Sequence, residues 1–112
     1  MTKPRCLDIH AHHVGQPLVE RINAEGEKHG VKIVKGEDGA TRISVGGRLT
    51  GMPLIPPLND EAARLKWMDE AGIDVQLLAG WMDLAGYHLP TEAGQWLARA
   101  QNETLAEMAA RR

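Results

Sequence analysis

Apolar and polar positions alternate along two short stretches in the first half of the chain, at residues 31–35 and 41–45. An Asp-Gly pair lies between them, which is typical of a tight hairpin turn because glycine accepts positive φ without steric cost. A short strand with apolar residues is predicted at 5–12, and it ends in a cluster of histidines. We therefore expect one strand near the N-terminus, followed by a β-hairpin that stands out as an exposed appendage.

Helical periodicity is weak at 18–28 and clearer at 58–68, where a loop rich in glycine and proline precedes it. Asn59 or Asp60 is suited to cap the second of these helices, because a short polar side chain can accept from a free N–H of the first turn. Gly72 follows as a typical helix stop. This segment is therefore predicted to be a helix with both ends marked.

The segment 73–79 is almost continuously apolar, which is typical of a parallel strand buried on both faces. After a loop at 80–90, Thr91 can cap a last helix whose apolar stripe continues to Arg112. Alternating helices and strands favour right-handed crossover units on a parallel sheet. The predicted fold class is therefore α/β.

Size and composition restrict the classes of function. The 112 residues suit one domain, and a complete eight-stranded α/β barrel takes about 250. A net charge of −2 and a pI near 6.2 give no electrostatic reason to expect nucleic acid as a partner. No apolar run approaches the ~20 residues that span a bilayer. With Cys6 as the single cysteine and no secretory signal, we expect a cytoplasmic protein that binds no membrane.

The sequence His10-Ala11-His12 is the main candidate for chemistry. Residues i and i+2 of a strand point to the same face, so the two imidazoles can share a cation, and imidazole suits zinc. A catalytic zinc site needs three protein ligands and a water, so the pair is not a complete site. The alternative is two histidines with roles in the core or in capping. By the same alternation Asp8 is predicted to share their face and to orient an imidazole, or else to bond the local backbone.

Four blocks, in this order, resemble the N-terminal part of the amidohydrolase superfamily, in the branch typified by aminocarboxymuconate semialdehyde decarboxylase. They are DIHAH at 8–12, a hairpin bearing Lys, Gly and Arg that contains Arg42, RLKWMDEAGIDVQLL at 64–78, and RAQNETLAE at 99–107. The resemblance covers essentially the whole chain. It implies that residues 1–112 are the N-terminal segment of a metal-dependent (β/α)8, TIM-like barrel that is incomplete in this chain, with 31–45 as an inserted β-hairpin.

The resemblance also implies roles for individual residues. His10 and His12 are ligands of one divalent metal ion, usually zinc, and the remaining ligands and the catalytic groups come from later strands, so this chain holds no catalytic residue. Arg42 stands where the family binds the substrate carboxylate, although an exposed hairpin charge is the alternative. Trp81 follows the predicted strand at 73–79, at the end that faces the active site of an α/β barrel. It is therefore predicted to line the substrate pocket, with core or interface packing as the alternative.

The expected function of the complete protein is a metal-dependent decarboxylase or hydrolase acting on a small carboxylated substrate, with the isolated chain inactive. The alternative is a truncated or split-barrel subunit without catalysis. Such a subunit would associate with itself or with a complementary C-terminal chain, because an incomplete parallel sheet has exposed edges.

Overall fold

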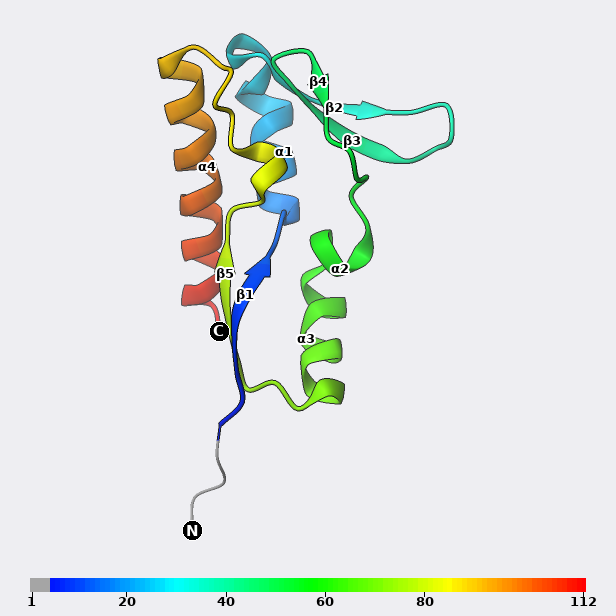
Figure 1. Ribbon diagram of the computed structural model, residues 1–112, viewed down its shortest axis with the longest axis vertical. Helices are drawn as coiled ribbons and strands as arrows, with labels where there is room; N and C mark the ends of the chain where they lie inside the picture. The colour runs from blue at the N-terminus through cyan, green and yellow to red at the C-terminus, as the bar shows by residue number, and fades with distance from the viewer. Residues whose placement is uncertain (1–4) are drawn as a thin grey trace.

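In the computed structural model, which describes residues 5–112, the strands form two separate sheets in a mixed α/β fold (Figure 1). Strands β1 (Leu7–His12) and β5 (Val75–Ala79) pair in parallel. The second sheet is antiparallel, in the order β2 (Val31–Lys35), β3 (Thr41–Val45) and β4 (Arg48–Leu49). The prediction of a parallel strand pair joined through helices is therefore confirmed.

Helices flank the parallel pair on both sides. The helices are α1 (Gln16–Glu25), α2 (Pro56–Asn59), α3 (Glu61–Ala71) and α4 (Thr91–Ala110), with 3-10 turns η1 (Gly26–His29) and η2 (Met82–Leu84). In Figure 1, α4 runs beside β5, α3 lies on the side of β1, and α1 packs along the upper half of α4. No helix in the described part of the chain is both long and apolar enough to cross a bilayer.

The turn and capping signals of the hairpin and of α3 produce the elements that they predict. The hairpin strands β2 and β3 have the predicted bounds, and in their turn the Asp38 carboxylate accepts from the Ala40 N–H at 3.0 Å. Asp60 caps α3 by accepting from the Ala63 N–H at 3.1 Å, and Gly72 ends this helix with φ at +74°. These features depend on a few neighbouring residues, which is why the sequence was sufficient to predict them. The predicted cap by Thr91 is wrong, because α4 begins at Thr91 itself, with Pro90 before it and no side-chain cap.

The stretch between the hairpin and α2, where glycine and proline predict a loop, holds the additional short strand β4. Gly46 and Gly47 both have positive φ, +57° and +83°, and together they make a two-residue turn from β3 into β4. Thr50, just after β4, donates its N–H to the Ile43 carbonyl at 3.0 Å. A Gly-Gly pair flanked by β-forming residues is a hairpin signal, so the sequence did carry a sign of this strand.

The base of the hairpin belongs to the main hydrophobic core, and the prediction of an exposed appendage is wrong for this part. Val31, Ile43 and Val45 are at most 1% exposed and pack in one cluster with Leu18 of α1 and Leu97 of α4. Only the tip of the hairpin extends away from the other elements in Figure 1. The reason is register: Val31 lies opposite Val45, so their apolar side chains share the face that α1 covers.

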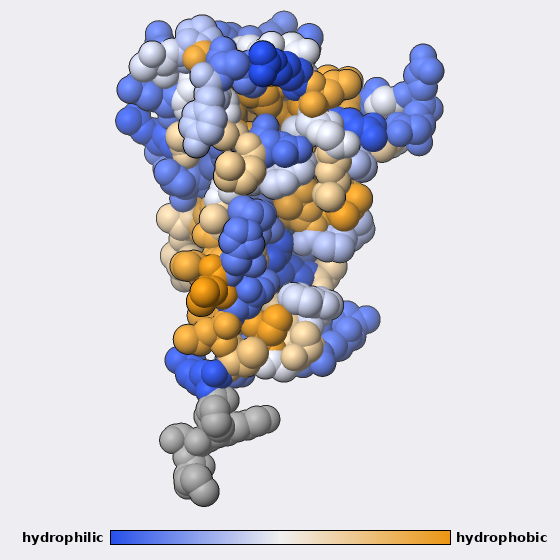
Figure 2. All heavy atoms as spheres, in the orientation of Figure 1, coloured by the Kyte–Doolittle hydropathy of each residue, from blue (hydrophilic) through white to orange (hydrophobic). Residues whose placement is uncertain are grey.

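Strand β5 is less buried than its composition predicts. Its exposed residues alternate with partly buried ones, and Val75 and Leu77 are 42% and 64% exposed. On β1, Leu7 and Ile9 are 60% and 77% exposed. The prediction of burial on both faces is wrong for residues 5–112, because β5 pairs only with β1 there and one face of the pair lies open. Figure 2 shows hydrophobic surface over the lower half of the molecule, where these strands lie.

Candidate metal-binding histidine pair

His10 and His12 lie together near the C-terminal end of β1. Their ring centroids are 4.9 Å apart, with the ring planes at 86°. The Nδ1 atom of His12 is 3.0 Å from the carbonyl oxygen of Gly80, the residue that follows β5. A carbonyl can only accept, so Nδ1 carries a proton, and in the neutral imidazole Nε2 then has the lone pair. This is the arrangement that fixes a metal-binding imidazole, with one nitrogen bonded to the protein and the other free.

A bulge interrupts β1 between Asp8 and Ala11, so that His10 lies within it and His12 after it. Asp8 lies opposite Gln76, Ala11 opposite Leu78 and His12 opposite Ala79, so three steps along β1 match two along β5. The additional residue reverses the alternation of side chains beyond it. Asp8 therefore faces the side of Gln76, and His12 faces the opposite side. The predicted shared face of Asp8 with both histidines is wrong, because strict alternation assumes an unbroken strand.

Asp8 bonds a neighbouring backbone N–H and a side chain of β5, and its carboxylate bonds no imidazole in the described structure. It accepts from Gln76 Nε2 at 2.9 Å and from the backbone N–H of His10 at 3.2 Å. These two hydrogen bonds lower the pKa of Asp8, with the Gln76 bond as the larger cause. The backbone alternative is the one that the structure contains, and Asp8 reaches the histidine pair through the main chain of His10.

Arg64, a residue that sequence reasoning did not single out, connects several of these groups. It is the one buried residue of α3, with 8% of its surface exposed. Its guanidinium donates to the His12 carbonyl, to the Pro57 carbonyl at 2.8 Å and to Gln76 Oε1 at 2.7 Å. Hydropathy patterns assign an arginine to the solvent side of a helix, so no local signal marked Arg64 as buried.

His13 follows the pair and is 4% exposed. Its Nδ1 accepts from Arg64 Nε at 3.3 Å. Burial lowers the pKa of His13 to about 4, and the positive charge of Arg64 adds to that effect. The imidazole of His13 is therefore neutral near pH 7, which suits its role as an acceptor.

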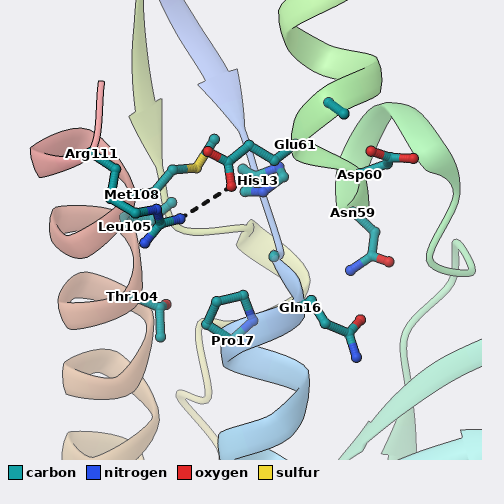
Figure 3. A pocket seen from close by; sticks show the side chains of 12 residues that line it. His13, Gln16, Pro17, Asn59, Asp60, Glu61, Thr104, Leu105, Met108 and Arg111 are labelled. Carbon is teal, nitrogen blue, oxygen red and sulfur yellow. Dashed lines mark hydrogen bonds and ion pairs between the residues drawn. The ribbon is translucent and has the colours of Figure 1, made fainter.

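His13 also lines a cavity of about 330 Å³ between α1, α3 and α4 (Figure 3). Glu61 and Arg111 close one side of it as an ion pair at 3.1 Å. Neither His10 nor His12 lines this cavity, so the cavity and the histidine pair are separate features.

The two predicted substrate contacts lie in different surroundings. Arg42 is 3.4 Å from the Asp38 carboxylate within the hairpin, and its charge contributes to lowering the pKa of Asp38 after the larger effect of the Ala40 N–H. The hydrogen bond of the Arg42 side chain is therefore within the hairpin, and the hairpin tip lies apart from the ends of β1 and β5 in Figure 1. Trp81 follows Gly80 directly and packs, partly buried, against the main core, as its packing alternative describes.

Within residues 5–112 no three His, Cys, Asp or Glu side chains converge as a metal site. The chain matches no protein-family model and no curated protein. Imidazole nitrogens are nevertheless donor atoms that zinc binds, so His10 and His12 could occupy two positions of its coordination sphere. The site therefore amounts to two candidate ligands, fixed by backbone contacts to β5 and to α3.

Proposed function

We propose that this chain is the N-terminal part of a metal-dependent, amidohydrolase-like (β/α)8 barrel that decarboxylates or hydrolyses a small carboxylated substrate. The main support is the His12 imidazole, which bonds Gly80 through Nδ1 and keeps Nε2 free beside His10. The pair also lies at the C-terminal end of two parallel strands, which is where α/β barrels carry their active sites. The four sequence blocks support the same family.

In this proposal His10 and His12 hold one divalent metal ion, for which zinc is the best match, and strands outside residues 5–112 supply the other ligands. The bound metal supplies an activated water by lowering its pKa. The Gly80 carbonyl keeps His12 in the tautomer that can bind. Arg42 is proposed to bind the substrate carboxylate, since its planar guanidinium can donate two parallel hydrogen bonds, and this requires it to leave Asp38. Trp81 is proposed to border the substrate pocket through its position after Gly80.

A metal analysis of the purified natural protein tests the proposal. We expect about one zinc per chain in the wild type and its loss in His10→Ala and in His12→Ala. His88→Gln is the matched control, because His88 bonds the Val45 carbonyl and lies outside the pair. Release of carbon dioxide or of a hydrolysis product from a panel of aromatic and unsaturated carboxylic acids should be lost in the same two variants. Metal retained in both variants would contradict the proposal.

A split-barrel subunit without catalysis is the second candidate. The exposed apolar side chains of Leu7, Ile9, Val75 and Leu77 favour it, because open apolar faces on a sheet are places where further strands dock. The intact mass of the protein in its natural source separates the candidates. A mass near 12.3 kDa, together with no activity, supports the subunit, and a mass about three times larger supports the single-chain enzyme.

A further inference from the structure

The C-terminal half of β1 has few partners of the kind that normally hold a strand. Its bulge falls between Asp8 and Ala11, and a bulge leaves a residue out of the ladder of hydrogen bonds. β5 is the only strand that pairs with it in residues 5–112. His10 lies inside this irregular stretch and the pairing with β5 resumes at Ala11 and His12, so contacts from outside the sheet add to those that hold the histidine pair.

Arg64 makes contacts from outside the sheet to this part of β1. One branch is direct, because Nη2 donates to the main-chain carbonyl of His12. The second branch is indirect: Nη1 donates to Gln76 at 2.7 Å, Gln76 donates to Asp8 at 2.9 Å, and Asp8 accepts from the His10 N–H at 3.2 Å. One guanidinium thus reaches the backbone of both histidines, His10 within the bulge and His12 after it.

The remaining contacts of Arg64 fix the guanidinium itself. Nη2 also donates to the Pro57 carbonyl, and Nε donates to the buried ring of His13. Every nitrogen of the guanidinium therefore has at least one acceptor, which a lysine at this position would not reproduce, because its single ammonium group cannot point in these three directions. The contacts of Arg64 come from β1, β5 and the segment before α3.

We propose that Arg64 is the positioning residue of the histidine pair: it sets the distance and orientation of His10 and His12 through the main chain, without touching the metal or the substrate. The inference rests on the proposed metal-binding function. It assigns the direct branch to His12 and the Gln76–Asp8 branch to His10. Loss of such outer contacts typically lowers metal affinity about 10- to 100-fold.

Imidazole ¹⁵N NMR of the metal-free protein provides the test, because it reports each ring separately from catalysis. In the wild type we expect His12 to show a protonated Nδ1 and an unprotonated Nε2. Arg64→Met should shift the His10 and His12 signals from their wild-type positions. Arg64→Lys should also leave them away from the wild-type positions. Gln76→Leu, which keeps Arg64, should move the His10 signals more than those of His12. The signals of His88 serve as an internal reference.

Leu97→Ala is the matched control, because it removes a fully buried side chain of the core that takes part in none of the hydrogen bonds described for this network. It should destabilise the fold and leave the His10 and His12 signals unchanged. Cobalt(II) titration of the same variants should show the 10- to 100-fold loss of affinity in Arg64→Met only. Unchanged His10 and His12 signals in Arg64→Met, or equal shifts in Leu97→Ala, would overturn the inference.

The outcomes also separate this inference from the proposed function. If the wild type binds no metal while Arg64→Met still moves both sets of signals, Arg64 positions the pair and the metal proposal fails. If His10→Ala and His12→Ala lose the metal while Arg64→Met changes nothing, the metal proposal stands and the role of Arg64 is refuted. If Arg64→Met does not fold, Gln76→Leu alone decides, by whether the His10 signals move more than those of His12.

Discussion

The two sheets of this protein bury their apolar side chains to opposite degrees. At the hairpin end, where β2, β3, α1 and the upper part of α4 meet, Ile43 and Leu97 are fully buried. At the parallel end, formed by β1 and β5, Ile9 and Leu77 are 77% and 64% exposed. The hairpin end is a completed core, and the parallel end is held by a buried arginine and leaves an apolar face open. Hydrophobic residues therefore have different roles at the two ends: they stabilise the first and offer a contact surface at the second.

Truncation in the completed core should have the largest effect. Leu97→Ala is expected to lower the free energy of unfolding by ~3 kcal/mol, because it removes buried methyl groups and leaves a cavity. Urea denaturation followed by circular dichroism measures this change. A loss below ~1 kcal/mol would show that the hairpin end is loosely packed and would remove the contrast between the two ends.

Removal of the buried arginine should have the next largest effect, at the parallel end. Arg64→Met is expected to cost ~2 kcal/mol, because the carbonyls of Pro57 and His12 lose charge-assisted hydrogen bonds in a buried place. Arg21→Met is the control, since Arg21 pairs with Glu103 on the surface and such pairs contribute about 0–1 kcal/mol. Equal losses in the two variants would contradict the role of Arg64 in holding the parallel end.

Acid should weaken the parallel end through His13, whose imidazole is buried and neutral in the folded chain. The pKa of His13 is about 4 in the folded chain and near 6.5 in the unfolded one. The unfolded chain therefore takes up a proton first, and stability falls as the pH decreases from about 6.5 to about 4. His13→Gln should remove most of this slope, as measured by urea denaturation at several pH values. An unchanged slope in that variant would assign the effect to other groups.

Loss of the Asp60 cap tests a signal that acts locally in the sequence, at the start of α3. Asp60→Ala is expected to lower the free energy of unfolding by ~1 kcal/mol, because the Ala63 N–H loses its acceptor. Asp60→Asn is the matched control, since asparagine caps nearly as well, and it should recover most of the loss. If the asparagine variant is as unstable as the alanine variant, the carboxylate charge and not the cap is what matters.

A polar residue on the open face should change the stability least. Leu77→Ser is expected to alter the free energy of unfolding by less than about 0.5 kcal/mol, because Leu77 is 64% exposed. It should, however, reduce concentration-dependent self-association in sedimentation velocity, where the wild type has this apolar surface available. A large loss of stability would mean that the parallel end depends on Leu77 for packing, which would contradict the comparison.

Prediction from sequence succeeded where the cause is local. The hairpin strands Val31–Lys35 and Thr41–Val45, the Asp60 cap and the Gly72 stop each depend on residues within a few positions. The histidine pair on one strand was predicted in the same way. Sequence reasoning failed for Asp8, because one additional residue in β1 reversed the face of the side chains that follow. It also failed for the hairpin base and β5, because burial depends on which elements pack against a strand.

The sequence by itself determined the order of the longer strands and helices, the turn between β2 and β3 and the proximity of His10 to His12, because hydrophobic period, glycine conformation and capping act over short distances along the chain. Only the tertiary structure decided how that pair is held. The His12–Gly80 and Asp8–Gln76 contacts each join residues 68 positions apart, and Arg64 enters the interior although its type favours the surface. Such contacts form when distant segments pack together, and a buried guanidinium is stable only where that packing provides an acceptor for each nitrogen.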